Sequence, residues 1–360
     1  MSSLPRKMKA VRVYAPQDYR LEEVAVPEVG PGEVLTRVLA TGVCASDVKA
    51  FHGSRVWGSA EIAPYIETPV TAGHEFAGEV VALGKGSAEK YGLAVGDHVV
   101  SEQIVPCGTC RFCVRGQYWM CQKHDIYGFK KSRAEGSWAQ YMLYPALAIN
   151  HKVPKSIPDD QAALIEPLAC AIHAVERGNI QLGDVVVIAG MGPIGLGMVS
   201  VARLKSPGML IALDMKPHRL ELARTMGADL ALDVSKQDAI AEVLKLTEGY
   251  GCDVYIEATG AGPAVVQGLQ MIRKLGTFVE FSVHGGPVAV DWSVIGDQKE
   301  LTINGAHLGP YCYPKAINYL AAGTVNGAAL VTHKLPLEKF LDGIEIAHTG
   351  DRSSKVVLVP

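Results

Sequence analysis

The sequence lacks an uninterrupted hydrophobic run of membrane-spanning length, a run of like charges and a strong net charge. Its most apolar stretch, Val185–Leu204, is interrupted by glycines and by Pro193, which favours a strand, a turn and a helix over a membrane span. The formal net charge of −3 gives no general attraction to nucleic acid or to anionic membranes. We therefore expect a small-molecule partner, with no nucleic acid and no membrane.

The amino terminus also lacks an apolar stretch as long as that of a signal peptide, and it runs directly into the strand-like segment Met8–Tyr14. We therefore expect a cytoplasmic protein. With 360 residues, of which 48% are hydrophobic, the chain can bury a large core in two domains. In a reducing compartment, its eight cysteines argue against a disulfide framework and for metal or reactive-thiol chemistry.

Four of the cysteines follow the pattern C-x2-C-x2-C-x7-C in a loop rich in glycine and aromatic residues: Cys107, Cys110, Cys113 and Cys121. Four thiolates at this spacing can surround one zinc ion tetrahedrally, and such a closed shell leaves no coordination position for a substrate. We therefore predict a structural zinc that holds together a lobe with little core of its own. An iron–sulfur cluster and four unrelated free thiols are the alternatives.

A second set of candidate ligands is scattered along the chain and consists of one thiol, one imidazole and two carboxylates: Cys44, His74, Glu75 and Glu166. Taken singly, such residues have ordinary explanations, for example a hydrogen-bonded core histidine or a carboxylate at the start of a helix. Together they form an incomplete zinc shell with room for a water or a substrate oxygen, which is typical of a catalytic site. Asp47 either orients the imidazole of His74 or occupies a turn.

The glycine-rich segment Gly190-Met191-Gly192-Pro193-Ile194-Gly195 fits the pattern G-x-G-x-x-G. It follows a predicted buried strand, Asp184–Ala189, and opens an apolar helix. Glycines let backbone N–H groups at the start of a helix approach a pyrophosphate, whose negative charge the helix dipole favours. A second strand, Met209–Leu213, ends at Asp214, nineteen residues after Gly195, as a dinucleotide-binding fingerprint requires.

The residue at the end of that second strand predicts which dinucleotide binds. The carboxylate of Asp214 can accept hydrogen bonds from the adenosine ribose and would repel the 2′-phosphate of NADP, so we predict NAD. Lys216 and Arg219 lie close behind and weaken this preference without reversing it. Arg219 is either a cofactor contact or a solvated surface residue.

Strands and helices alternate beyond this motif, which predicts an α/β fold with a doubly wound parallel sheet. The predicted strands are Ala231–Val234, Val254–Glu257 and Thr277–Phe281, and the predicted helices are His218–Met226, Asp238–Thr247 and Ala264–Leu275. Residues 8–150 instead carry short strand-like runs broken by glycine and proline, which indicates a β-rich domain. Past residue 306, we expect a helix near Pro314–Ala322 and a closing strand, Ser354–Val359, that returns to the β-rich domain.

The motifs GVCASD, GHE, the four-cysteine lobe, EPLAC and GMGPIG occur together, and in this order the chain resembles the zinc-dependent medium-chain alcohol dehydrogenase family over almost its whole length. Glutamate at position 166 is similar to the polyol branch, which contains sorbitol, threitol and erythritol dehydrogenases and threonine dehydrogenase. The resemblance implies a GroES-like catalytic domain (residues 1–165 and 307–360), a Rossmann domain (residues 166–306) and a homodimer or homotetramer. It also implies that Cys44, His74 and Glu75 or Glu166 hold the catalytic zinc and that Ser46 starts a proton relay.

The chain departs from the family pattern at two places. Lys49 occupies a position where many relatives carry a histidine, so the outer part of the proton path differs. The segment Gly305–Gly309 replaces an arginine–tyrosine pair common in sorbitol dehydrogenases, which makes sorbitol a less expected substrate.

We therefore expect a zinc-dependent enzyme that transfers a hydride from a secondary alcohol of a small, erythritol- or threitol-like polyol to NAD, with two zinc ions per chain. L-Threonine 3-dehydrogenase or another diol dehydrogenase of the same family is the main alternative. A zinc-free quinone reductase would lack the intact ligand set, and a structural zinc- and nucleotide-binding protein would have a damaged one.

Overall fold

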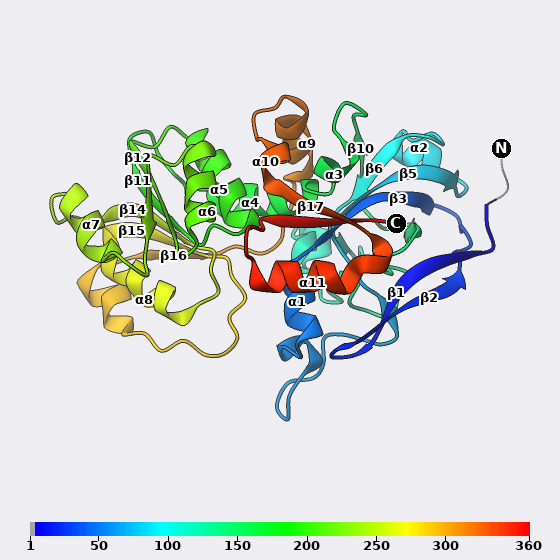
Figure 1. The fold of residues 1–360 in the computed structure, drawn as a ribbon, viewed down its shortest axis with the longest axis horizontal. Helices are drawn as coiled ribbons and strands as arrows, with labels where there is room; N and C mark the ends of the chain where they lie inside the picture. Colours follow the sequence, from blue (N-terminus) through cyan, green and yellow to red (C-terminus); the bar gives the residue numbers. More distant parts are fainter. Residues whose placement is uncertain (1–3) are drawn as a thin grey trace. The chain divides into compact units, whose positions relative to one another are not determined.

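The computed structural model describes residues 4–360 (Figure 1). These residues form two compact units. The first contains the chain up to Glu166 together with Tyr313–Pro360, and the second is Pro167–Cys312. Among the described residues, no helix combines the length and the apolarity that crossing a membrane would require.

The first unit is built on a seven-stranded sheet with the order β10-β6-β5-β3-β18-β17, in which β9 also pairs with β3. The central strand β3 is almost entirely buried, as its apolar sequence VLTRVLATGV requires. Strand β18 pairs antiparallel with β3, so the carboxyl-terminal chain lies beside the middle of this sheet. The strands are β3 (Val34–Val43), β5 (Phe76–Leu83), β6 (His98–Ser101), β9 (Tyr141–Tyr144), β10 (Asn150–Val153), β17 (Val331–Pro336) and β18 (Lys355–Val359).

Two smaller sheets complete the strands of this unit. One has the order β2-β1-β4, and the other is the pair β7-β8. The segment between β7 and β8 contains the four closely spaced cysteines and has only the short 3-10 turns η2 and η3, which agrees with a lobe of little core. The bounds are β1 (Lys7–Ala15), β2 (Asp18–Ala25), β4 (Val70–Thr71), β7 (Ile104–Val105), β8 (Asp125–Ile126), η2 (Cys113–Arg115) and η3 (Tyr118–Met120).

Short helices connect the strands of the first unit. Helix α1 follows β3 directly, and Asp47 fixes its start because Oδ2 accepts a hydrogen bond from the backbone N–H of Cys44 at 2.9 Å. The sequence predicted α9 but neither α1 nor α11. The helices are α1 (Ala45–Phe51), η1 (Arg55–Trp57), α2 (Ser87–Tyr91), α3 (Asp159–Ala162), α9 (Tyr313–Ala321), α10 (Gly327–Leu330), η5 (Leu337–Lys339) and α11 (Phe340–Thr349), while α4 (Ile165–Arg177) continues into the second unit.

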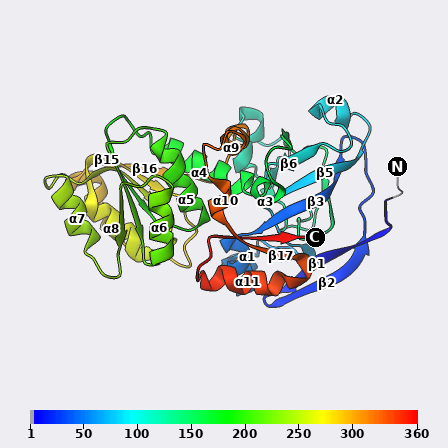
Figure 2. The same ribbon diagram turned by 45° about the horizontal axis from the view of Figure 1, so that its top comes forward.

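The second unit contains a six-stranded sheet with the order β13-β12-β11-β14-β15-β16, and every pair in it is parallel. Helices cover both faces of this sheet (Figure 2). Its apolar strands therefore pack on both sides, which explains the unbroken run VVVIA of β11. The predicted doubly wound parallel sheet is confirmed. The strands are β11 (Val185–Ala189), β12 (Met209–Asp214), β13 (Leu230–Asp233), β14 (Cys252–Glu257), β15 (Ile272–Glu280) and β16 (Thr302–Gly305).

The helices of the second unit follow the strand–helix alternation of the sequence, with one exception. The predicted helix Ala264–Leu275 was wrong at its end, because α8 stops at Met271 and β15 begins at Ile272. Pairing of Ile272 with Cys252 of β14 extends this strand, and Leu275 takes a positive φ of 59°. The helices are α5 (Pro193–Arg203), α6 (Pro217–Thr225), α7 (Ala239–Leu246), α8 (Gly262–Met271) and the π-helix η4 (Val294–Gln298).

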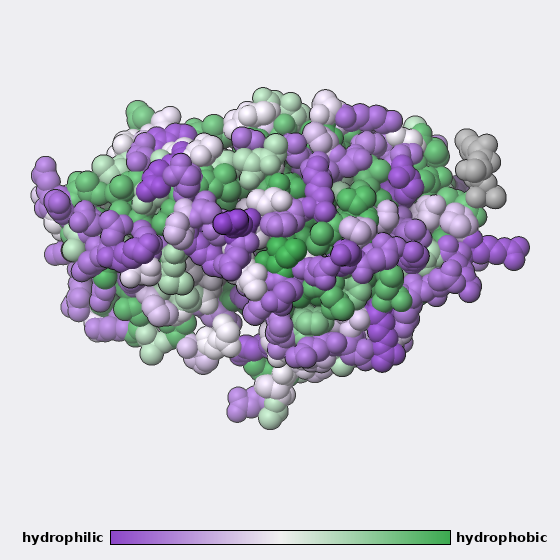
Figure 3. Space-filling view, in the orientation of Figure 1, coloured by the Kyte–Doolittle hydropathy of each residue, from purple (hydrophilic) through white to green (hydrophobic). Residues whose placement is uncertain are grey.

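The surface carries polar and apolar side chains in mixture on the face shown in Figure 3. Large apolar side chains are nevertheless exposed at single positions, such as Leu182 and Trp292. Isolated apolar residues of this kind are normal on a folded protein, whose surface is never wholly polar.

Candidate active site and cofactor-binding residues

The structure brings Cys44, His74 and Glu75 together at one edge of the large sheet. Strands β3 and β5 are antiparallel neighbours, and Thr41 pairs with Phe76. The end of β3, which carries Cys44, therefore lies beside the start of β5, which His74 and Glu75 precede. The ligand atoms of the three residues all lie within 4.8 Å of one another. A thiolate, an imidazole and a carboxylate at this separation suit zinc and leave a position for a substrate oxygen.

Two residues of α1 contact the imidazole of His74 from opposite sides. Ser46 Oγ lies 3.3 Å from Nε2, and Asp47 Oδ1 lies 3.5 Å from Nδ1. Asp47 is buried and also caps α1, so both explanations offered for it from the sequence describe the same side chain. With Nδ1 facing a carboxylate, Nε2 is the nitrogen left to bind a metal.

The charges at this site act on one another because little water reaches them. Burial lowers the pKa of His74, but the negative charges of Asp47 and Cys44 outweigh it and raise that pKa well above its ordinary value. Glu75 is 0% exposed and Glu166 is 4% exposed. Glu166 lies in the first turn of α4, outside the group of ligand atoms that Cys44, His74 and Glu75 form.

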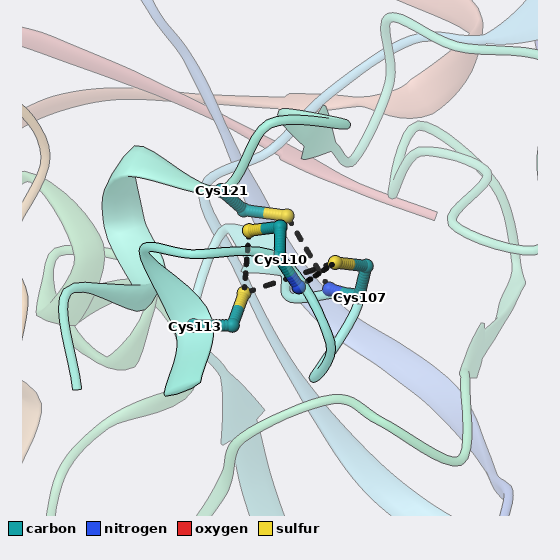
Figure 4. A group of neighbouring side chains, drawn as sticks. All are labelled: Cys107, Cys110, Cys113 and Cys121. Atoms are coloured by element: carbon teal, nitrogen blue, oxygen red, sulfur yellow. Dashed lines mark hydrogen bonds between the residues drawn. The ribbon is translucent and has the colours of Figure 1, made fainter. Parts of the chain in front are cut away.

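The four cysteines of the lobe converge on one point (Figure 4). Sγ of Cys113 lies 3.5 Å from that of Cys110 and 4.0 Å from that of Cys107. Four sulfurs at 2.3 Å from a tetrahedral zinc would be separated by about 3.8 Å, so this arrangement fits the ion. All eight cysteines of the chain are free thiols.

The lobe is prepared for thiolates but does not hold four of them without a cation. Backbone N–H groups of Thr109 and Cys110 donate to Sγ of Cys107 and lower the pKa of that thiol to about 6. Burial and the neighbouring Cys110 raise the pKa of Cys113 to about 12. A bound dication would remove this conflict by deprotonating the remaining thiols.

The glycine-rich loop joins β11 to α5 in the conformation that the motif predicted. Gly190 has a φ of +95°, which a residue with a side chain rarely adopts. A methyl group on Gly195 would overlap the carbonyl oxygen of Gly190, so glycine is needed for the close approach of the helix to the loop. Gly192 is the residue before α5, Pro193 is its first residue, and Ile194 follows.

Asp214 ends β12, beside this loop. Because β11 and β12 are parallel neighbours with Ala189 opposite Leu213, their carboxyl ends lie together. Oδ2 of Asp214 accepts a hydrogen bond of 2.7 Å from the N–H of Met191, which ties the loop to β12. Arg219 lies in the first turns of α6, and its Nε is buried without a hydrogen-bond partner.

Sequence reasoning missed two residues that shape the catalytic cluster. The ring of Phe129 packs against that of His74, with 5.5 Å between ring centroids. Lys355 donates hydrogen bonds to both carboxylate oxygens of Glu75, at 2.7 and 2.6 Å. Neither residue belongs to a motif, and only the pairing of distant strands brings Lys355 to the site.

A further group of ligand-type side chains lies at the carboxyl ends of β14 and β15 and comprises Glu257, Glu280 and His284. Glu257 already accepts hydrogen bonds from the N–H groups of Thr259 and Gly260. Its buried carboxylate therefore has a structural role in shaping the loop after β14.

Comparisons with known proteins agree with these sites. The pattern described as "Alcohol dehydrogenase GroES-like domain" matches residues 30–155, and "Zinc-binding dehydrogenase" matches residues 193–322. An erythritol/L-threitol dehydrogenase of Mycolicibacterium smegmatis is 53% identical over 360 residues, which cover 100% of this chain and 99% of the relative. An L-threonine 3-dehydrogenase of Pyrococcus horikoshii is 37% identical, with 94% of each chain covered.

A solved structure extends the similarity to three dimensions. A zinc-binding dehydrogenase of Sinorhizobium meliloti bound to NADP has a TM-score of 0.87 and 29% identity. The alignment covers 98% of this chain and 99% of that one. The zinc and nicotinamide-dinucleotide requirement predicted from the sequence is thereby confirmed.

We predict that Cys44→Ser and Cys110→Ser each lower the metal content from about two zinc ions per chain to about one, because each variant breaks a different ligand set. Elemental analysis of the purified variants measures this. Limited proteolysis distinguishes them, because only Cys110→Ser should open the lobe to cleavage. An unchanged metal content in either variant would contradict the assignment of that site.

We predict that Asp47→Asn weakens zinc binding at Cys44 and His74 by about 10- to 100-fold, because the imidazole loses the carboxylate that orients it. Competition with a chelator measures the affinity. Zinc in the four-cysteine lobe of the same protein is the internal control, and its affinity should not change. Equal weakening at both sites would indicate general unfolding instead.

We predict that Asp214→Ala lowers the ratio of kcat/KM with NAD to kcat/KM with NADP by about ten-fold or more, because one charge interaction of about 1.4 kcal/mol changes cofactor choice by that factor. Steady-state kinetics with both cofactors measure the ratio. Asp184→Ala, next to the opposite end of β11, is the matched control. A ratio unchanged in Asp214→Ala would sink the role given to this carboxylate.

Proposed function

This chain belongs to the zinc-dependent alcohol dehydrogenase family, and from that premise we propose that it oxidises a secondary alcohol of a small, erythritol- or threitol-like polyol to the ketone, with NAD as hydride acceptor. The observation that carries the proposal is the 53% identity over the full chain to an erythritol/L-threitol dehydrogenase. The cluster of Cys44, His74 and Glu75 supports it, since these residues provide an open zinc site.

The residues of the site have distinct roles in this reaction. Cys44, His74 and one of the carboxylates Glu75 and Glu166 hold the zinc, which when bound supplies the Lewis acidity that makes an alcohol hydroxyl acidic near neutral pH. Ser46 lies beside the imidazole and takes the proton that the substrate hydroxyl loses. Asp47 keeps the imidazole in the orientation and tautomer that metal binding needs.

Ser46 begins a proton path that differs from the common one, because Lys49 stands where many relatives carry a histidine. Lys49 is exposed in the last turn of α1, one turn after Ser46. Its ammonium donates protons but does not accept them, so the outward path from Ser46 runs through hydroxyl groups or water.

The second unit binds the dinucleotide. Backbone N–H groups of the glycine-rich loop and of the start of α5 bind the pyrophosphate, for which the helix dipole is favourable. Asp214 accepts hydrogen bonds from the ribose hydroxyls, and its charge disfavours NADP. The Sinorhizobium relative contains NADP, so the preference of this chain for NAD rests on Asp214, with Arg219 nearby as a further cofactor contact.

We further propose that the enzyme is a cytoplasmic homodimer or homotetramer. Strand β16 lies at one edge of the parallel sheet, and residues 302, 303 and 305 of it are exposed. Ile303 is 43% exposed, and a strand edge of this kind is a ready surface for pairing with a second copy. Eight free thiols, four of them at a zinc site, require a reducing compartment.

L-Threonine 3-dehydrogenase activity is the second candidate, since relatives of that name are 36–37% identical over at least 94% of the chain. This identity is lower than that to the polyol enzyme, and the sequence offers no evident group for an amino acid's ammonium and carboxylate. A zinc-free quinone reductase and a structural protein are disfavoured, because both zinc-ligand sets are complete.

The proposal is tested by NADH formation across a panel of erythritol, L-threitol, pentitols, sorbitol, 2,3-butanediol and L-threonine. We predict the highest kcat/KM with a four-carbon polyol. Ser46→Ala should keep its zinc but lose about 10²-fold or more in kcat, because the first proton acceptor is gone. A preference for threonine would establish the second candidate, and no turnover of any alcohol would refute both.

A further inference from the structure

Lys355 and Glu75 form an ion pair in the interior of the first unit. Nζ donates to both carboxylate oxygens, at 2.7 and 2.6 Å, and also lies 3.4 Å from the carbonyl oxygen of Val43. Lys355 is 2% exposed and Glu75 is 0% exposed. A pair of charges so far from water is costly, and replacing it by apolar residues is often neutral or stabilising. Stability alone therefore gives a weak account of why this pair is here.

The register of three strands places the pair beside the metal ligands. Strand β3 lies between β5 and β18, and Val43 of β3 pairs with Val356 of β18. Glu75 precedes β5 on one side of β3, and Lys355 begins β18 on the other. Their side chains therefore meet across the last residues of β3, immediately before Cys44.

Gly42 makes this crossing possible. It pairs with Val357 of β18, and its N–H donates a 2.7 Å hydrogen bond to the carbonyl oxygen of Glu75. A methyl group on Gly42 would overlap Oε2 of Glu75 and lie 3.1 Å from its Cβ. The absence of a side chain at Gly42 thus provides the space in which the carboxylate lies against Lys355.

Three anionic groups share this region: the thiolate of Cys44 and the carboxylates of Glu75 and Glu166, and all three act electrostatically on Lys355. A zinc ion with Cys44, Glu166 and neutral His74 is electrically balanced. Glu75 with Lys355 is balanced as well. Both oxygens of Glu75 are already occupied by short charge-assisted bonds, although one of them lies within 4.8 Å of the other ligand atoms.

We propose that Lys355 is a positioning residue of the catalytic metal site, which holds both oxygens of Glu75 away from the resting zinc across Gly42 and leaves the third protein position to Glu166. Removing the ammonium frees Glu75 to enter the zinc shell and occupy the position that the substrate hydroxyl needs. This inference rests on the proposed function, since it concerns the zinc that the proposed reaction uses.

The test is the visible absorption spectrum of the cobalt-substituted full-length enzyme. The Cys44 site is isolated by subtracting the spectrum of the matching Cys44→Ser protein, which retains the cobalt of the lobe. An added ligand raises the coordination number and weakens the d–d absorption. We expect this loss of intensity in Lys355→Met, together with about a 10- to 100-fold loss of kcat.

Three further variants separate positioning from a purely structural role. Lys355→Arg should keep the wild-type spectrum, because it retains the cation. Gly42→Ala should reproduce the spectrum of Lys355→Met, because the methyl group displaces Glu75 while every charge remains. Lys355→Met combined with Glu75→Gln should regain the wild-type spectrum, because the freed carboxylate is gone, and it keeps the test decisive if Lys355→Met alone does not fold.

Two results would overturn the inference alone: a wild-type spectrum in both Gly42→Ala and Lys355→Met, or loss of the Cys44-dependent spectrum in Glu75→Gln, which would make Glu75 a resting ligand. Polyol oxidation by the wild type would then still stand. If the wild-type enzyme itself shows no Cys44-dependent cobalt spectrum, the proposed function fails with it.

Discussion

The pairing of β3 with β5 on one side and β18 on the other is the constraint on which the catalytic site depends. It brings Cys44, His74 and Glu75 within 4.8 Å of one another and places Lys355 against the same carboxylate. No local segment of the chain could do this, because the ligand side chains come from segments that meet only in the sheet. The buried charges persist because each has a partner, and a dication supplies the partner that the thiolate lacks.

The two metal sites show how the number of ligands decides function. The lobe offers four thiols, whose sulfur separations of 3.5 and 4.0 Å bracket the edge of a tetrahedron around zinc. Such a shell is closed and can only hold the lobe together. The site at Cys44 has fewer protein ligands and adjoins a hydroxyl, that of Ser46, so a substrate oxygen can join it and lose its proton there.

Features encoded by short spacings were predictable from the sequence. The lobe, the glycine-rich loop and the strand–helix alternation each depend on residues close in the chain, and the parallel sheet was found as expected. The end of α8 was misplaced because pairing of Ile272 with β14 overrides the local helical pattern. Lys355 was missed because it contacts a residue 280 positions away, through a strand register that no motif reveals.

The central claim is that a zinc ion binds at Cys44 and His74 in addition to the one in the lobe. Anomalous diffraction at the zinc absorption edge, from crystals of the enzyme grown with NAD, tests it most directly. The account predicts two anomalous peaks in every chain, one among the four lobe cysteines and one between Cys44 and His74. A peak at the lobe alone, in crystals of protein that oxidises a polyol, would contradict it.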